Sequence, residues 1–225
     1  MLDLVLPQAC AGCGVRGARA RFCANCLAEL TAGPARRVPG PCPPELPDCW
    51  SAGDYAGAAR RAILAYKERG AVALAGVLAE VLAFTAVTAI AGAGGAWAGR
   101  GFAVVPVPSR RASVAARGHD PIGRLAVLAA GRLRAYGLAA EPWAALRQVR
   151  RVADQAGLSA AERSANLAGS LQVRKPGKGR PVLDVLLVDD ILTTGATLTE
   201  AARALRAAGL RVPLAVTVAA TRRRS

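Results

Sequence analysis

The strongest chemical signal in the sequence is the stretch VDDILTTGAT at residues 188–197. It follows an apolar run typical of a buried strand and leads into a sequence typical of a helix. The part from Thr193 to Thr197 offers hydroxyls and backbone N–H groups in a tight turn, and Gly195 lets the backbone approach a ligand closely. The following helix adds the positive end of its dipole. Together these features suit the binding of a phosphate monoester.

Two acidic residues, Asp189 and Asp190, precede this loop. Adjacent carboxylates beside a phosphate site suit the two vicinal hydroxyls of a ribose, or Mg²⁺ held through water. The alternative is a purely structural turn at the end of a strand, in which Asp190 and the threonines cap the helix. The complete order of strand, acid pair, loop and helix favours a phosphoribosyl ligand, because ribose 5-phosphate satisfies both features at once.

Four cysteines near the N-terminus form two Cys-x-x-Cys pairs, Cys10 with Cys13 and Cys23 with Cys26. Two such pairs can present four thiolates to one Zn²⁺ ion in a tetrahedron, and four cysteine ligands close the site to substrate. We therefore predict a structural zinc site. Disulfide bonds, which are rare in cytosolic proteins, and unpaired thiols are the alternatives. Cys42 and Cys49 lack this spacing and are expected to be ordinary thiols.

Two hydrophobic patterns alternate along the rest of the chain and define the elements that position these residues. Apolar runs typical of buried strands occupy residues 102–107, 182–188 and 211–219. Apolar residues at helical spacing occupy residues 71–90, 122–136, 158–167 and 197–208. Ser159 and Glu162 form a capping box at the start of the third helix. Strands that alternate with helices predict an α/β fold with a mostly parallel sheet flanked by helices.

Residues 1–50 differ from the remainder in being rich in Cys, Pro and Gly, with little periodicity. We predict a zinc-binding module with a Pro-rich linker at 1–50 and an α/β domain at 51–225. The first residues lack the charged segment and the long apolar run of a signal peptide, which favours a cytoplasmic protein. The uncharged stretch 81–98 is rich in Ala, Gly and Thr, so we expect part of a soluble helix there and no membrane span.

The composition narrows the possible functions. The 225 residues are 53% hydrophobic, which argues against a disordered chain. His119 is the single histidine, so metal sites built from two histidines are excluded. The 30 basic and 15 acidic residues give a net charge of +15, and ten arginines lie between residues 100 and 151. This excess indicates either a polyanionic partner or a coding bias toward arginine. Aromatic residues make up only 4%, so a base-stacking surface is poorly supplied.

The acid pair with its loop resembles the phosphoribosyl pyrophosphate (PRPP) motif of type I phosphoribosyltransferases. A four-cysteine cluster ahead of that motif resembles the ComF family, which includes competence protein F and GntX-like proteins. Further supporting segments are RRAILAYK at 60–67, VPVPSR at 105–110 and Arg117-Gly118, together with Gln155, Glu162-Arg163 and Asn166. The resemblance covers most of the chain. It departs at His119, where the family usually has an aromatic residue; His119 either contacts substrate or caps the next helix.

The resemblance implies a role for each of these groups. Thr193, Thr194, Gly195, Ala196 and Thr197 would bind the 5-phosphate, and Asp189 and Asp190 the ribose hydroxyls, with Mg²⁺ bridging the pyrophosphate. Candidates for contacting pyrophosphate are Ser109, Arg110, Arg117, Lys67 and Arg163. Arg117, Arg163 and Lys67 could equally face solvent. Residues 147–155 would form a mobile flap. Hypoxanthine and guanine enzymes usually place an acid where this chain has Thr193, so 6-oxopurine salvage is disfavoured.

Two functions follow from the resemblance. The first is a PRPP-dependent phosphoribosyltransferase of unidentified acceptor, which displaces pyrophosphate from the anomeric carbon. The alternative is an accessory protein of natural transformation that handles single-stranded DNA beside a helicase-like ATPase, using the zinc module and the basic surface. A PRPP-sensing regulator is a third possibility, but the sequence contains no helix-turn-helix pattern to support it.

Overall fold

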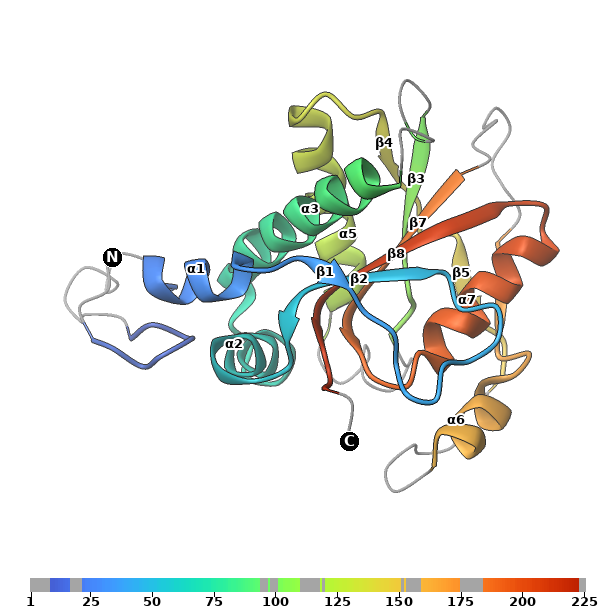
Figure 1. Ribbon diagram of the computed structural model, residues 1–225, viewed down its shortest axis with the longest axis horizontal. Coiled ribbons are helices and arrows are strands. Elements are labelled where there is room, and N and C mark those ends of the chain that lie inside the picture. The colour runs from blue at the N-terminus through green and yellow to red at the C-terminus, as the bar shows by residue number, and fades with distance from the viewer. Residues whose placement is uncertain are drawn as a thin grey trace.

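The computed structural model describes residues 9–16, 22–93, 97, 101–109, 118, 120–150, 152, 159–174 and 184–222. The first elements are α1 (Ala24–Thr31), β1 (Ala35–Arg36), β2 (Asp48–Asp54), α2 (Gly57–Glu68), η1 (Val72–Leu74) and α3 (Ala75–Gly92). The middle contains β3 (Phe102–Pro106), α5 (Pro121–Ala135), β4 (Ala140–Pro142) and β5 (Leu146–Gln148). The last are α6 (Ala160–Leu167), β6 (Leu171–Val173), β7 (Asp184–Leu192), α7 (Ala196–Ala207) and β8 (Arg211–Ala220). Figure 1 shows their arrangement.

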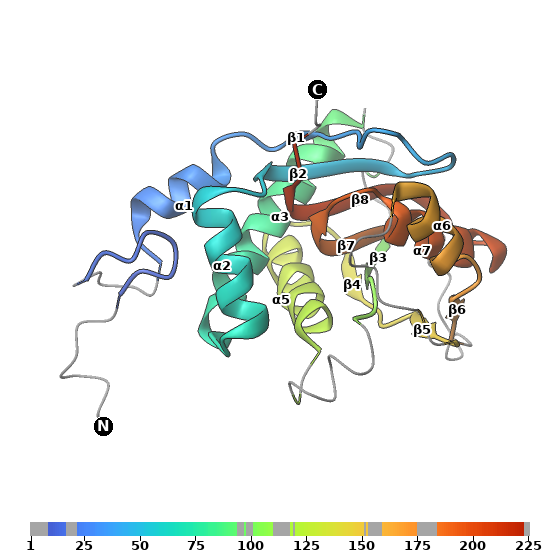
Figure 2. The same cartoon turned by 90° about the horizontal axis from the view of Figure 1, so that it is seen from below.

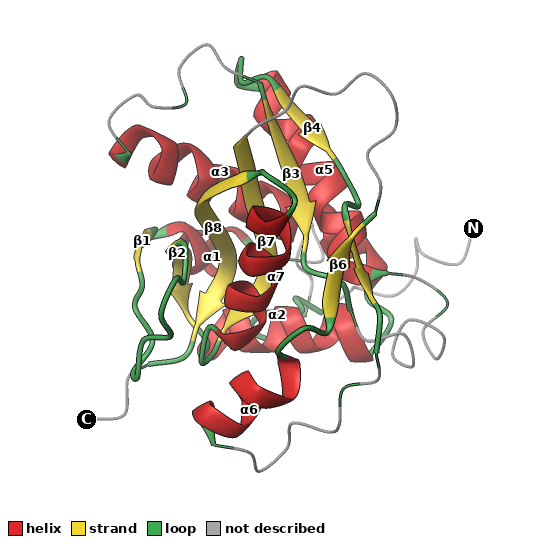
Figure 3. Ribbon diagram, turned by 90° about the vertical axis from the view of Figure 1, so that its right-hand side faces the viewer, coloured by secondary structure: helices red, strands yellow, loops and turns green. Residues whose placement is uncertain are grey.

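The central sheet has six strands in the order β1-β2-β8-β7-β3-β4. Every neighbouring pair is parallel except β1 with β2, which is antiparallel. The α/β fold with a mostly parallel sheet is therefore confirmed, and the predicted strands correspond to β3, β7 and β8. A separate antiparallel pair, β5 with β6, lies beside the sheet. Along the chain, β5 precedes α6 and β6 follows it (Figure 3).

Helices cover both faces of the sheet, so the buried strands are apolar on both sides. Val104, Leu186 and Val216 belong to a core that they share with α2, α3 and α5. The alternate residues Val105, Leu187 and Ala215 belong to a second core that they share with α7. Figure 2 shows α2, α3 and α5 on one side of the strands and α6 and α7 on the other. The period of two along each strand thus explains why continuous apolar runs appear in the sequence.

The predicted helix at 71–90 forms as η1 and α3. In the described part of the chain, one helical stretch, Val72–Gly92, is long and apolar enough to cross a membrane by length and composition. Most of it is buried: Leu78, Leu82 and Ala86 are each at most 1% exposed. The helix packs on α5 and on the strands β2 and β8. Its apolar character is therefore accounted for by its place in the core.

The N-terminal fifty residues contribute more to the sheet than their composition suggests. Residues 35–36 form β1, and β2 crosses position 50, where the sequence suggested that the linker ends. Ser51 on β2 is fully buried, and its hydroxyl lies 2.5 Å from that of Thr217 on β8. Leu46 and Pro39 of the Pro-rich segment between the two strands pack against Gly195, in the loop between β7 and α7.

The capping box at the start of α6 forms as predicted. The backbone N–H of Ser159 donates to the Glu162 carboxylate at 2.7 Å, and the backbone N–H of Glu162 donates to the Ser159 hydroxyl at 3.3 Å. Both N–H groups would otherwise lack a partner at a helix start, so the pair fixes where α6 begins.

Candidate functional site

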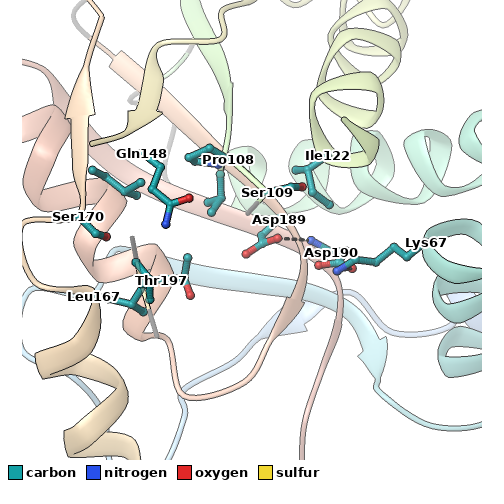
Figure 4. A pocket seen from close by; sticks show the side chains of 13 residues that line it. Lys67, Pro108, Ser109, Ile122, Gln148, Leu167, Ser170, Asp189, Asp190 and Thr197 are labelled. Carbon is teal, nitrogen blue, oxygen red and sulfur yellow. Dashed lines mark hydrogen bonds and ion pairs between the residues drawn. The ribbon is translucent and has the colours of Figure 1, made fainter. Parts of the chain in front are cut away.

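A cavity of about 250 Å³ opens beside the ends of β3 and β7. The carboxyl ends of parallel strands meet at one edge of a sheet, which is where open α/β sheets bind ligands. Five residues singled out in the sequence line this cavity: Lys67, Ser109, Asp189, Asp190 and Thr197. They come from α2, the segment after β3, the strand β7 and the first turn of α7 (Figure 4). The fold thus brings together side chains that lie far apart in the sequence.

The loop between β7 and α7 has the backbone conformation that its sequence predicts. Gly195 has φ of +78°, in the left-handed region that favours glycine. A Cβ atom at this position would lie 3.0 Å from Leu46 Cδ1 and 3.3 Å from Pro39 Cγ, so the Pro-rich segment packs directly on the loop. Thr197 faces the cavity, whereas Thr193 is exposed and lines a second cavity. The Ala196 N–H donates to the Thr194 hydroxyl at 3.5 Å.

The two aspartates of the cavity have different surroundings. The Asp190 side chain is 7% exposed, and its Oδ2 lies 2.7 Å from Lys67 Nζ. Asp189 accepts the backbone N–H of Asp190 at 2.8 Å and keeps a partly exposed surface toward the cavity. Protein packed around Asp189 removes much of its water, and this desolvation raises its pKa well above the ordinary value, with a further rise from the charge of Asp190. A bound cation or hydroxyl group would favour the ionised form.

Lys67 reaches the acid pair because α2 is fixed at both of its ends. Near its C-terminus, the buried Tyr66 hydroxyl donates to the carbonyl of Pro121, the first residue of α5, at 2.9 Å. At its first turn, the N–H of Ala58 donates to the Glu29 carboxylate of α1 at 3.2 Å. Such a carboxylate also interacts favourably with the positive end of the helix dipole. The position of the ammonium group is therefore set by contacts to two other helices.

The remaining pyrophosphate candidates are found in different places. Ser109 lies just after β3, lines the cavity, and its hydroxyl donates to Asp120 Oδ1 at 3.2 Å. Arg163 lies on α6 and does not line the cavity; its buried Nε has no hydrogen-bond partner among the described residues. Arg110 and Arg117, and also His119, lie outside the described residues.

Two further polar residues line the cavity, one inside the segment 147–155 predicted as a flap and one that escaped the sequence analysis. Gln148 on β5 and Ser170 just before β6 both line it (Figure 4). Ser170 is fully buried, and its hydroxyl has no hydrogen-bond partner among the described residues. A buried hydroxyl without a partner beside a cavity is a candidate ligand contact. The predicted flap begins with Arg147 and Gln148 in β5, and its residues 151 and 153–155 lie outside the described residues. Ser170 belongs to no recognisable motif, so only the pairing of β5 with β6 could reveal it.

The segment that carries Ser170 is held from α7 by Glu200. This carboxylate is 5% exposed, accepts the backbone N–H of Leu171 at 3.0 Å and pairs with Arg203 at 2.7 Å. Burial opposes its ionisation, but the hydrogen bonds from Arg203 and Leu171 outweigh burial and lower the pKa of Glu200 below its ordinary value. The β5–β6 pair is thereby attached to α7.

The four cysteines form a candidate metal site of the kind that holds zinc. The sulfur atoms of Cys10, Cys13, Cys23 and Cys26 all lie within 4.8 Å of one another. A tetrahedral zinc site with bonds of about 2.3 Å places its sulfurs about 3.8 Å apart. The measured separation of Cys13 Sγ from Cys23 Sγ is 3.8 Å. Cys42 and Cys49 are not part of this cluster.

The backbone around the cluster favours thiolates and close packing. Burial opposes ionisation of Cys10, but backbone N–H groups, first that of Cys23, outweigh it and lower the pKa of Cys10 to about 6. Burial raises the pKa of Cys26, a change that a bound metal would reverse. A Cβ atom at Gly12 would lie 2.7 Å from Cys26 Sγ and 2.9 Å from the Phe22 ring, so the turn requires glycine.

A parallel α/β sheet with an acid pair and a glycine-containing loop at its carboxyl edge is an arrangement that suits phosphorylated ligands. Residues 125–225 match the family model for the phosphoribosyl transferase domain. The match begins within α5 and includes the acid pair, the loop and β8. The cysteine cluster, Lys67 and Ser109 lie outside it. A comparison with curated proteins found no match.

Proposed function

We propose that this protein binds PRPP and transfers its phosphoribosyl group to an acceptor with release of pyrophosphate. The observation that carries the proposal is the single cavity lined by the acid pair, Thr197 of the loop, Ser109 and Lys67. Each of these groups suits one part of PRPP: the loop from Thr193 to Thr197 suits the 5-phosphate and the acid pair suits the ribose hydroxyls. Ser109 and Lys67, on the β3 and α2 sides, suit the pyrophosphate.

The chemistry assigned to the acid pair is electrostatic. As pyrophosphate leaves the anomeric carbon, positive charge develops on the ribose ring. Asp189 and Asp190, held beside the ring, stabilise that charge, and such pre-arranged groups are worth several kcal/mol in a site that excludes water. Lys67 neutralises Asp190 before substrate arrives, and its ammonium group lies at the cavity, where the anionic leaving group would also be attracted to it.

The cavity also suits Mg²⁺. Among its described lining residues, two carboxylates face one ammonium group, that of Lys67, so the pair can accept further positive charge. Carboxylate oxygens are ligands that Mg²⁺ prefers. When bound with PRPP, the ion would neutralise the pyrophosphate oxygens. Asp189 and Asp190 would hold it, directly or through water.

The cysteine cluster is assigned a structural Zn²⁺ ion, because four thiolates leave no open position for substrate. We place the protein in the cytoplasm, where such thiols stay reduced. Membership of the ComF family, and with it a role in DNA uptake beside a helicase-like ATPase, rests on the sequence resemblance and stays a prediction.

Calorimetric titration of PRPP with Mg²⁺ into the zinc-loaded protein tests the proposal, with pyrophosphate release followed over a panel of bases. Thr197→Val should weaken PRPP binding by about ten-fold, since it removes a hydroxyl from the phosphate loop. Thr199→Val is the matched control, because its buried hydroxyl has no hydrogen-bond partner among the described residues. Binding with release identifies an enzyme and its acceptor. Binding without release favours a sensing or DNA-handling role, and absence of binding contradicts the proposal.

A further inference from the structure

The second cavity, of about 520 Å³, lies at the carboxyl ends of β2, β8 and β7. Its walls come from residues 36–39, from Asp54 at the end of β2, from the end of β7 with Thr193, and from residues 220–222 at the end of β8. It shares no described lining residue with the cavity that holds the acid pair. A ligand of the second cavity therefore occupies a site of its own.

Backbone hydrogen bonds fix the walls of this cavity to the sheet. The N–H of Arg37 donates to the carbonyl of Cys49 on β2 at 2.7 Å. The N–H of Thr221 donates to the carbonyl of Leu192, the last residue of β7, at 2.9 Å. Both segments that carry the arginines of the cavity are thus attached to strands, so their side chains start from fixed positions.

Positive charge is in excess among the described lining residues, which include three arginines, Arg36, Arg37 and Arg222, and one acid, Asp54. Arg36 pairs with Asp48 outside the cavity. Asp54 Oδ2 lies 2.8 Å from Arg222 Nε, within hydrogen-bond distance. Asp54 Oδ1 lies 3.6 Å from Arg37 Nη2, which is too far for a hydrogen bond. The single carboxylate of the cavity therefore satisfies Arg222 better than Arg37.

Arg37 is the residue that points to a ligand. Its Nε is buried and has no hydrogen-bond partner among the described residues. A buried guanidinium donor without a partner is costly, and an anion bound beside it would satisfy it. Thr193 and Thr221 line the same cavity and carry hydroxyls that can donate to such an anion.

We propose that the second cavity binds a phosphate group between Arg37 and Arg222, at a site separate from the one proposed for PRPP. Arginine is well suited to this group, because its planar donors match pairs of phosphate oxygens. Donors that come from three segments suit a tetrahedral anion better than a planar carboxylate, because its oxygens point in more directions. A free phosphate ion and the terminal phosphate of a nucleotide share this chemistry. The inference does not depend on transfer in the first cavity.

Calorimetric titration of the zinc-loaded full chain with inorganic phosphate, ADP and adenosine tests the inference, without Mg²⁺ and at one fixed salt concentration. Phosphate can also bind the loop of the first cavity, so each titration is repeated in Thr197→Val, which weakens that site. We expect phosphate binding to persist in Thr197→Val. Adding Arg37→Gln or Arg222→Gln to it should weaken this binding by about ten-fold, because a charge-assisted hydrogen bond is lost. Arg222 is 79% exposed, so its substitution tests the site even if Arg37→Gln fails to fold.

The control is Arg211→Gln, which removes an arginine at the other end of β8. Arg211 pairs with Asp184 at 2.7 Å, much as Arg222 pairs with Asp54, so the change in net charge and in ion pairing is matched. It should leave phosphate binding intact.

The inference is overturned if Thr197→Val abolishes all phosphate binding, if Arg211→Gln acts like Arg222→Gln, or if adenosine binds as tightly as ADP and with the same response to the variants. Tighter binding of ADP than of phosphate identifies a nucleotide as the ligand, and equal affinities identify the free ion. Each of these results is obtained without PRPP, so failure of the proposed function would leave this inference standing, and the reverse also holds.

Discussion

The cysteine cluster and the carboxyl edge of the sheet are built in opposite ways. All four cysteines lie between residues 10 and 26, so a short segment can form the candidate metal site. The carboxyl edge takes Lys67, Ser109 and Asp190 from segments separated by whole helices and strands. The cluster therefore needs only a few tight turns, together with the zinc ion proposed for it, whereas the carboxyl edge depends on the complete sheet. The two regions should respond differently to substitution.

Loss of the metal should give the largest effect. Cys26→Ser removes one of four candidate ligands, and we expect zinc to be absent from the purified protein and the cysteine segment to lose about 5 kcal/mol of local stability. Hydrogen exchange should increase in residues 9–31 and stay unchanged at β7 and β8. Cys42→Ser, an exposed thiol outside the cluster, is the control and should change neither quantity. Increased exchange throughout the sheet would show that the two regions are one cooperative unit.

The acid pair should show the reverse pattern. Asp190→Asn keeps the shape of the side chain but removes the charge that pairs with Lys67, and we expect turnover to fall about a thousand-fold, or about 4 kcal/mol, with the fold retained. Asp184→Asn is the control at the opposite edge of the sheet, where it should cost stability but not turnover. Steady-state kinetics and thermal melts measure the two effects. Unchanged turnover in Asp190→Asn would remove the role proposed for it.

The smallest of the three effects concerns pH. Because the pKa of Glu200 is lowered in the folded state, its stabilising contribution is complete above its unfolded pKa of about 4.5 and is lost as the pH falls through the lower folded value. Glu200→Gln should cost about 2 kcal/mol at neutral pH and flatten this acid-side loss. Urea unfolding between pH 3 and 7 measures it, with the exposed Glu141→Gln as control. If the free energy of unfolding changed with pH equally in Glu200→Gln and in the unsubstituted protein, the lowered pKa of Glu200 would be contradicted.

Much of the framework could be predicted because its signals are local. The loop between β7 and α7, the capping box of Ser159 and Glu162, and the strands β3, β7 and β8 each follow from a few adjacent residues. The segment 35–54 was harder to predict, because its prolines hide the strands β1 and β2. These two strands pair with each other, and β2 also pairs with β8. The contact of Arg222 with Asp54 could not be predicted, because it depends on β2 and β8 being neighbours. Ser170 could not be predicted at all, because a hydroxyl without a partner is a property of its surroundings.

The helix α2 touches both regions, and this determines how each can be studied. Its twelve residues span about 18 Å. Its first turn meets Glu29 of α1, and Arg61 Nε bonds the carbonyl of Gly12 within the cysteine cluster. Its last turn carries Lys67 to Asp190. A chain shortened to begin after α1 would leave the start of α2 without its acidic partner Glu29, and a shift of this helix would also move Lys67 relative to Asp190. Deletion of the N-terminal segment is thus an ambiguous experiment for this molecule, and single substitutions that leave α1 in place are the informative ones.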